Sequence, residues 1–424
     1  MASFCRLYFL KTMKKFTLNQ FPVVIMLAAV CMACGPKVTL NVTNTLPSDR
    51  MGEMVDFPAS EIAQMGEDFV ICNAQGEEIP YQVTYDGKVI FNADVKANAT
   101  ATYTIKKGKH AEWKNVACGR QYPERDDDMA WENDRVAFRT YGPALQARGE
   151  KGFGFDLFLK YASEEPVLEE LYGTALNPET HKKMKELRAA GNKAAADSIS
   201  RAISYHIDHG KGMDCFAVGP TLGCCTPALL DSVGNIVYTW CYNSYEILDN
   251  GPLRFTMKLV YGPISIDGND NVTQTRLISL DKGSQLNKTV VTFDNLQKET
   301  RLAVGISLRE ADPEEYVMDP QKRFISYEDL TQNPVGNDGK VYPGALTLPA
   351  FEETTVAMFP EKMGTAMGHV MGVKNYKPGT AFTYYWGYGW TKSGFADQKA
   401  WTDYLTARHA ALQSPLQVSV IADK

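Results

Sequence analysis

The sequence predicts a mostly β protein, a large antiparallel β-sandwich with one helical insertion and a C-terminal helix. Many short segments alternate apolar and polar residues, as half-buried strands do. Turn residues such as Asp86-Gly87 separate these segments, and only residues 177–203 and roughly 397–412 have helical composition and spacing. Because strand follows strand with few helices between, antiparallel pairing is favoured over a parallel α/β fold.

The first 36 residues predict export and a lipid anchor. A basic segment and a short apolar run, too short to span a membrane, are typical of a signal peptide over residues 1–33. Ala33-Cys34-Gly35 resembles a bacterial lipobox, so we expect Cys34 to carry lipid in a short tether of residues 34–36. The expected location is the periplasmic face of the outer membrane. Cleavage near Ala33 without lipidation is the alternative.

Residues 37–424 are expected to form a single sandwich domain, with residues 37–108 as an N-terminal strand layer. The first segment, KVTLNVTNTL, alternates apolar and polar residues with period two. The insertion at 177–203 is rich in Ala, Lys and Glu, and Pro178 suits a first helical turn. It leads directly into Tyr205, where the first candidate site begins.

Charge and cysteine spacing exclude several classes of function. The net charge of −6 offers no basic footprint, so we expect no nucleic-acid partner. An anionic ligand would need a local group of arginines. The six cysteines after Cys34 lack the CxxC spacing of zinc or redox sites, and buried packing is the default expectation for them.

The stretch YHIDHGKGMD, which begins at Tyr205, holds the first candidate chemistry. It contains two histidines, two aspartates and two glycines: His206, His209, Asp208, Asp214, Gly210 and Gly212. The glycines disfavour a long helix, and strand residues three apart point to opposite sides, so metal ligation would need a loop. We expect no cofactor, with a divalent metal as the alternative. One histidine, preferably His206, is expected to transfer protons while the other is structural.

The second candidate cluster is residues 120–143, where four arginines lie among six acidic residues and several aromatics. If NDRVAFRTYG is a strand, Arg135, Arg139 and Tyr141 share one face. Arginine binds carboxylates through two parallel hydrogen bonds, so this face predicts anion or sugar binding. Trp131 is a further candidate substrate-binding residue in the same cluster. A solvated network of salt bridges is the alternative.

The third cluster is the aromatic segment FTYYWGYGWTKSGF. Aromatic faces pack well against sugar rings, so Tyr384, Trp386 and Trp390 are candidate substrate-binding residues. Burial of the same side chains in the core is an equal alternative.

Together these motifs resemble the uncharacterised family DUF4861 over nearly the whole mature chain. The resemblance is carried by ERDDDMAWENDRVAFRTYGP, then YHIDHGKGMD with VGPTLG, then YYWGYGW and the terminal PLQV. It implies a Bacteroidetes protein of polysaccharide utilisation for uronate-containing glycans, with a β-supersandwich like that of galactose mutarotase-like and polysaccharide-lyase proteins. It supplies no established reaction. This sequence departs from the family at Cys224-Cys225, where glycines are expected, and in a longer insertion before Tyr205.

The expected function is a periplasmic lipoprotein enzyme acting on uronic-acid-containing oligosaccharides. In β-elimination, arginines neutralise the carboxylate, a histidine removes the C5 proton and a tyrosine protonates the leaving oxygen. The candidates for these three roles are Arg135 and Arg139, His206 and His209, and Tyr141 and Tyr205.

Three other functions stay open. Glycoside hydrolysis would pair Asp208 with Asp134 or Asp214 as the two carboxylates. A mutarotase- or epimerase-like enzyme would use a histidine acid with a carboxylate base. In a non-catalytic glycan-binding lipoprotein, the arginines, the aromatics and Asp214 would hold the oligosaccharide. The oligomeric state is not predicted.

Overall fold

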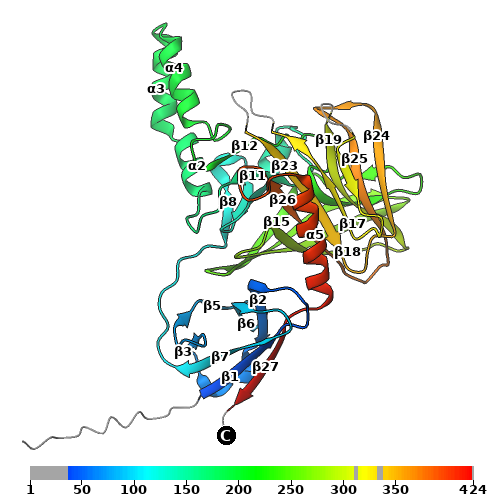
Figure 1. Cartoon of the computed structure of the whole chain (residues 1–424). Coiled ribbons are helices and arrows are strands. Elements are labelled where there is room, and N and C mark those ends of the chain that lie inside the picture. Colours follow the sequence, from blue (N-terminus) through cyan, green and yellow to red (C-terminus); the bar gives the residue numbers. More distant parts are fainter. Residues whose placement is uncertain (1–36, 310–313, 332–337, 423–424) are drawn as a thin grey trace, which may run out of the picture. The chain divides into compact units, whose positions relative to one another are not determined.

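A computed structural model describes residues 37–309, 314–331 and 338–422 (Figure 1). The predicted signal peptide and the lipidation site at Cys34 lie outside the described residues. Strands hold 49% of the residues and helices 16%, and the named strands pair antiparallel, so the mostly β prediction is confirmed. No helix among the described residues is long and apolar enough to cross a membrane.

The N-terminal layer consists of two small sheets with a hydrophobic core of their own. Val38, Leu40 and Val42 are fully buried in that core, as the period-two pattern predicts. The chain's last strand pairs with its first, so the C-terminus completes this layer. The first sheet has the order β27 (Gln417–Ala422), β1 (Lys37–Thr43), β7 (Thr100–Lys107), β3 (Phe69–Cys72), β4 (Glu78–Ile79); the second has the order β2 (Arg50–Pro58), β6 (Lys88–Val95), β5 (Tyr81–Val83).

Two larger sheets follow. The nine-stranded sheet contains β15 (Tyr242–Asn250), β16 (Arg254–Ile266), β17 (Asn269–Asp281), β18 (Leu286–Asp294), β26 (Phe382–Trp390), β23 (Lys340–Thr347), β21 (Phe324–Tyr327) and β20 (Tyr316–Met318), with β22 (Asp329–Leu330) on β23. The five-stranded sheet contains β14 (Ile236–Val237), β13 (Cys224–Leu230), β19 (Thr300–Arg309), β25 (Ala366–Tyr376) and β24 (Glu353–Met363).

A fifth sheet, which we call the site sheet, carries the candidate residues. Its order is β12 (Gly212–Asp214), β11 (Asp156–Lys160), β10 (Ala137–Thr140), β9 (Asp128–Glu132), β8 (Cys118–Tyr122). Trp131 and Phe138 on its inner face share one hydrophobic core with residues of both larger sheets, including Phe255 and Val304. Three sheets therefore enclose a single core, as in a sandwich.

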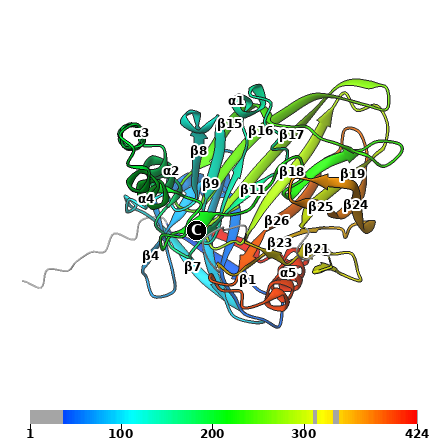
Figure 2. The same cartoon turned by 90° about the horizontal axis from the view of Figure 1, so that it is seen from above.

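The helices lie outside these sheets, and residues 178–203 form a helical hairpin that projects away from them (Figures 1 and 2). The predicted insertion forms α3 (Pro178–Ala189) and α4 (Lys193–Ile203), each capped by an asparagine side chain, after the short α2 (Leu168–Ala175). The predicted C-terminal helix is α5 (Gln398–Gln413), which packs on β23 and β21. The remaining helical segments are α1 (Pro143–Ala147) and 3₁₀ turns at Ala59–Met65 and Pro123–Arg125.

A buried ion pair fastens α2 to the outer face of the site sheet. Lys160 Nζ on β11 lies 2.6 Å from Glu132 Oε2 on β9, with both side chains at least 98% buried. Glu132 also accepts hydrogen bonds from the backbone N–H groups of Val167 and Leu168, where α2 begins. A carboxylate at this position favourably meets the positive end of the helix dipole.

We expect Glu132→Ala to lower the free energy of unfolding by about 3–5 kcal/mol, because it leaves the Lys160 charge unpaired in the interior. Urea unfolding measures this loss. The exposed pair of Lys258 with Glu246 provides the control, since Glu246→Ala should cost no more than about 1 kcal/mol. Equal losses in the two variants would contradict this account of the ion pair.

Candidate functional site

Besides the pair of Glu132 and Lys160, the outer face of the site sheet carries a cluster of four buried charged residues. Side chains of a strand alternate between faces, and the apolar residues of these strands, including Trp131 and Phe138, point to the core. Asp128, Arg139, Asp156 and Asp214 lie on the opposite face, on β9, β10, β11 and β12 in turn, and each is at most 3% exposed. Arg139 stands directly opposite Asp156 in the pairing of β10 with β11.

Arg139 is the centre of this charge cluster. Its Nε donates to Asp156 Oδ2 at 3.0 Å, and its Nη2 contacts the same oxygen and Asp214 Oδ2, the latter at 2.8 Å. Asp128 Oδ2 lies 3.6 Å from Nη1. Three carboxylates neutralise this guanidinium, and its Nη1, which has no hydrogen-bond partner, is buried, so it is poorly placed to bind the carboxylate of a ligand.

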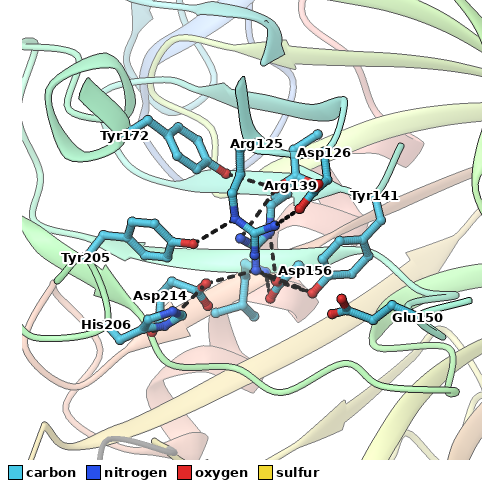
Figure 3. A network of polar contacts seen from close by, with 12 residues as sticks. Arg125, Asp126, Arg139, Tyr141, Glu150, Asp156, Tyr172, Tyr205, His206 and Asp214 are labelled. Carbon is cyan, nitrogen blue, oxygen red and sulfur yellow. Dashed lines mark hydrogen bonds and ion pairs between the residues drawn. The ribbon is translucent and has the colours of Figure 1, made fainter. Parts of the chain in front are cut away.

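Two further side chains surround the cluster. Tyr141 donates its phenol proton to Asp156 Oδ2 at 2.7 Å, and Arg125 donates from Nε to the Tyr205 hydroxyl at 3.0 Å. In Figure 3, Tyr205 lies on one side of the two arginines and Tyr141 on the other. Tyr205 is buried against Tyr172 and Phe158, so it holds Arg125 in place from the interior.

Burial changes the acidity of these groups. It raises the pKa of Asp128 to about 7, although the charges of Arg139 and Arg125 oppose the rise. It also raises the pKa of Asp156. Burial and the negative charge of Asp156 raise the pKa of Tyr141 well above its usual value, so this phenol keeps its proton near neutral pH.

A closed loop places His206 beside this cluster. Asp214 N–H donates to the Tyr205 carbonyl at 2.8 Å, which brings the two ends of the YHIDHGKGMD stretch together. Gly212 adopts φ +108°, and a β-carbon there would collide with the Leu159 carbonyl, so only glycine fits. Asp208 holds the turn by accepting from Gly210 N–H at 2.8 Å and from the Tyr161 hydroxyl at 2.7 Å.

His206 has one ring nitrogen fixed. Its Nδ1 lies 2.9 Å from the Asp214 carbonyl oxygen and 3.5 Å from Asp214 Oδ2. A carbonyl only accepts, so Nδ1 carries a proton and Nε2 of the neutral ring is a proton acceptor. The side chain is 56% exposed, which leaves it accessible to a ligand.

These residues line one cavity of about 620 Å³. Arg139, Tyr141, His206 and Asp214 contribute to its wall, together with Arg125, Arg201 of α4 and Glu150. The volume lies within the range of small-molecule sites in proteins. Residues from two of the three sequence clusters, together with the helical insertion, therefore meet at one pocket.

Several candidates from the sequence lie outside this pocket. His209 is exposed and does not line it, and Asp208 is bonded into the turn. Although burial opposes ionisation, hydrogen bonds from Tyr161 and the glycine N–H groups lower the pKa of Asp208. Arg135 precedes β10 in the turn after β9, where it pairs with Asp134 at 3.1 Å, so the expected row with Arg139 does not form.

The aromatic candidates are core residues in the structure. Trp131, Tyr384, Trp386 and Trp390 have no exposed surface. Trp386 stacks on Phe155 with ring centroids 4.4 Å apart, and hydrogen bonds satisfy the indole N–H groups of all three tryptophans. Of the two alternatives for this segment, the structure places these side chains in core packing.

Sequence reasoning missed Asp156 and left Arg125, Glu150 and Arg201 without roles. Asp156 interrupts the apolar run FGFDLFLK, and a lone carboxylate inside a buried strand requires a partner. Asp156 could therefore have been identified as a candidate from the sequence. Arg201 and Glu150 are exposed, and their place at the pocket follows from the paths of α4 and of the loop after α1.

The described residues contain no group of three or more His, Cys, Asp or Glu side chains suited to hold a metal ion. In the aspartate cluster, Arg139 occupies the position between the carboxylates and supplies the positive charge.

A family model described as "Domain of unknown function (DUF4861)" matches residues 42–418. The chain belongs to the DUF4861 family. The predicted family resemblance is therefore confirmed, and the match covers both the N-terminal layer and the pocket.

Comparison with individual proteins adds little about activity. The DUF4861 chain is 25% identical to "Uncharacterized protein P7" of Formosa agariphila over 406 residues, which cover 90% of this chain and 93% of that protein. It also resembles solved structures of an α-mannosidase from Enterococcus faecalis (10% identity, TM-score 0.49, 92% of this chain) and of the α-galactosidase AgaB from Geobacillus stearothermophilus (11% identity, TM-score 0.31, 64% of this chain). The DUF4861 chain spans only 46% and 41% of those two chains. These structural likenesses are too distant to assign an activity.

The raised pKa of Asp128 predicts how stability changes with pH. The folded protein keeps this proton up to about pH 7, whereas the unfolded chain releases it near the ordinary aspartate pKa of 3.8. The folded state then binds more protons, so the free energy of unfolding should fall as pH rises from about 4 to 7, by at most about 4 kcal/mol. Asp128→Asn should flatten this fall in urea unfolding series. The exposed-site variant Asp270→Asn should keep the wild-type slope, and an unchanged slope in Asp128→Asn would refute the assignment.

Proposed function

We propose that this protein is a carbohydrate-active enzyme that cleaves uronic-acid-containing oligosaccharides by β-elimination. The supporting observation is the meeting of His206, Tyr141 and Arg125 in one cavity of about 620 Å³. A proton acceptor, a proton donor and a cation are the three groups that elimination next to a carboxylate requires.

His206 is the proposed base. Its Nε2 is free to accept the C5 proton of the uronate, since Nδ1 is held by the Asp214 carbonyl at 2.9 Å. The nearby Asp214 carboxylate, 3.5 Å from Nδ1, stabilises the imidazolium that forms. His209 has no such contacts and takes no part.

Tyr141 is the proposed acid. Asp156 and Arg139 fix its hydroxyl at the cavity wall, at 2.7 Å and 3.3 Å. Its raised pKa keeps the phenol protonated, and in the reaction the O–H turns from Asp156 Oδ2, which accepts it in the structure, to the leaving O4. The C4–O4 bond breaks, O4 takes the tyrosine proton, and the electrons of the C5–H bond form the C4–C5 double bond.

The cations for the substrate carboxylate are Arg125 and Arg201, which replace the expected pair Arg135 and Arg139. Both line the cavity, whereas Arg139 is neutralised by three aspartates and Arg135 lies elsewhere. Arginine suits this role because its planar fork matches a carboxylate.

Glycoside hydrolysis is the second candidate, because Glu150 and Asp214 line the same cavity and provide two carboxylates. The products separate the reactions. Elimination gives an unsaturated uronate that absorbs in the ultraviolet, whereas hydrolysis consumes water and gives a saturated end.

The two histidines of one motif supply a matched test. On acidic oligosaccharides, His206→Ala should lower kcat/KM by roughly 10²–10⁴-fold, because it removes the base, and His209→Ala should leave it unchanged. Ultraviolet absorbance and mass spectrometry of the products report the rate and the reaction type.

Tyr141→Phe should lower kcat more than it raises KM, since phenylalanine keeps the aromatic ring at the cavity wall but lacks the hydroxyl proton. Melting temperatures establish that each variant is folded. Equal activity of His206→Ala and His209→Ala would refute the assignment of the base. A saturated product would favour hydrolysis.

We also propose that Cys34 anchors the protein in a membrane facing the periplasm. Cys34→Ala should move the expressed protein from the membrane fraction of a Gram-negative host to its soluble periplasmic fraction, because no acyl chain is attached. Incorporation of labelled palmitate by the wild type alone provides the direct measurement. Membrane retention of the variant would exclude the anchor.

A further inference from the structure

A row of polar side chains crosses the outer face of the nine-stranded sheet, away from the pocket around His206. Thr256, Ser279, Lys288 and Tyr385 stand directly opposite one another on β16, β17, β18 and β26. Their sequence neighbours point the other way, into the core. Because adjacent strands lie about 4.8 Å apart, the row is about 14 Å long. We call it the polar row.

Two groups of the polar row lack partners. The exposed side chain of Lys288 has no hydrogen bond or ion pair within the described residues, although Lys88, Arg254 and Arg408 around it all have acidic partners. Desolvation, and then the charges of Arg254 and Lys88, lower the pKa of Lys288.

Thr256 is 2% exposed, and its hydroxyl has no hydrogen-bond partner. A buried hydroxyl without a partner is unusual, and the exposed Lys288, two strands away, is the cation of the polar row that no acidic side chain among the described residues neutralises.

A cavity of about 240 Å³ lies over the polar row. Its far wall comes from the N-terminal layer and includes Tyr85, which is 49% exposed, and Lys88. A second cavity of about 240 Å³ shares Asp281, Ser284 and Arg408 with the first and extends it. Neither has a lining residue in common with the pocket around His206.

We propose that the polar row is a second, non-catalytic binding site for an acidic saccharide. Lys288 binds a carboxylate or sulfate group, the hydroxyls of Ser279 and Tyr385 bond to sugar hydroxyls, and the ring of Tyr85 packs against a sugar face. The site is separate from the acid–base pocket, so it stands whether or not β-elimination occurs there. It would hold a polymer on the enzyme between cleavage events.

Calorimetric titration of the full mature chain carrying His206→Ala tests this site without turnover. The probes are an oligogalacturonate, a sulfated dextran oligosaccharide and a neutral dextran oligosaccharide. Adding Lys288→Ala should weaken binding of the acidic probes about 10-fold or more, because a charged hydrogen bond is lost. That binding should also weaken with salt.

The matched control is Lys258→Ala. Lys258 lies two residues from Thr256 on the same face, pairs with Glu246 at 2.7 Å and does not line the cavity. It should bind the acidic probes as the parent does. A second variant, Tyr385→Phe, removes one hydroxyl and should weaken binding of the acidic probes by a smaller factor.

Four results would overturn the site: no binding of either acidic probe, equal binding of the neutral probe, equal effects of Lys288→Ala and Lys258→Ala, or no effect of Lys288→Ala. Preference for the carboxylate or the sulfate probe identifies the acid group. Product formation by the wild type is measured separately, so failure of the acid–base pocket and failure of the polar row are distinguishable.

Discussion

The cost of burying charge governs the organisation of the site. Three carboxylates on adjacent strands would repel one another and lose their hydration, so this face of the sheet is stable only with Arg139 between them. That arrangement fixes the pairing of β9 to β12 and orients Tyr141 through Asp156. Leu168 and Tyr172 of α2 pack on the same face of the sheet. A rigid, preorganised set of groups is what acid–base catalysis needs.

The same constraint explains why His206, the proposed base, lies on a loop and not on a strand. Asp214 belongs to the buried cluster, and its carbonyl still has an acceptor position for His206 Nδ1. The ring therefore takes its orientation from the rigid sheet while it stays accessible. Gly212 makes this possible, because the strand passes so close to Leu159 that no side chain fits. The glycines of the motif are thus backbone requirements of the turn.

Period-two alternation predicted much of the fold, including the first strand and the shared face of Arg139 and Tyr141. It failed for Arg135 because β10 begins only at Ala137. Alternation also correctly predicts that Tyr384 and Trp386 share one face of their strand. It cannot tell whether that face meets the core or the solvent. At Cys225, where the family pattern expects glycine, φ is +62°, a conformation that glycine adopts without strain. Contacts between distant segments, such as Arg201 with the pocket, have no local sequence signal.

An acidic protein that recognises an acidic glycan must concentrate its cations locally. With a net charge of −6, the long-range field repels such a ligand. In physiological salt, charges farther apart than about 8 Å are largely screened, so only nearby groups decide binding. Arg125 and Arg201 provide such a group at the pocket, and Lys288 provides one on the outer sheet face. Because each acts over a short range, the two proposed sites would hold separate parts of one polymer without competing for its charge.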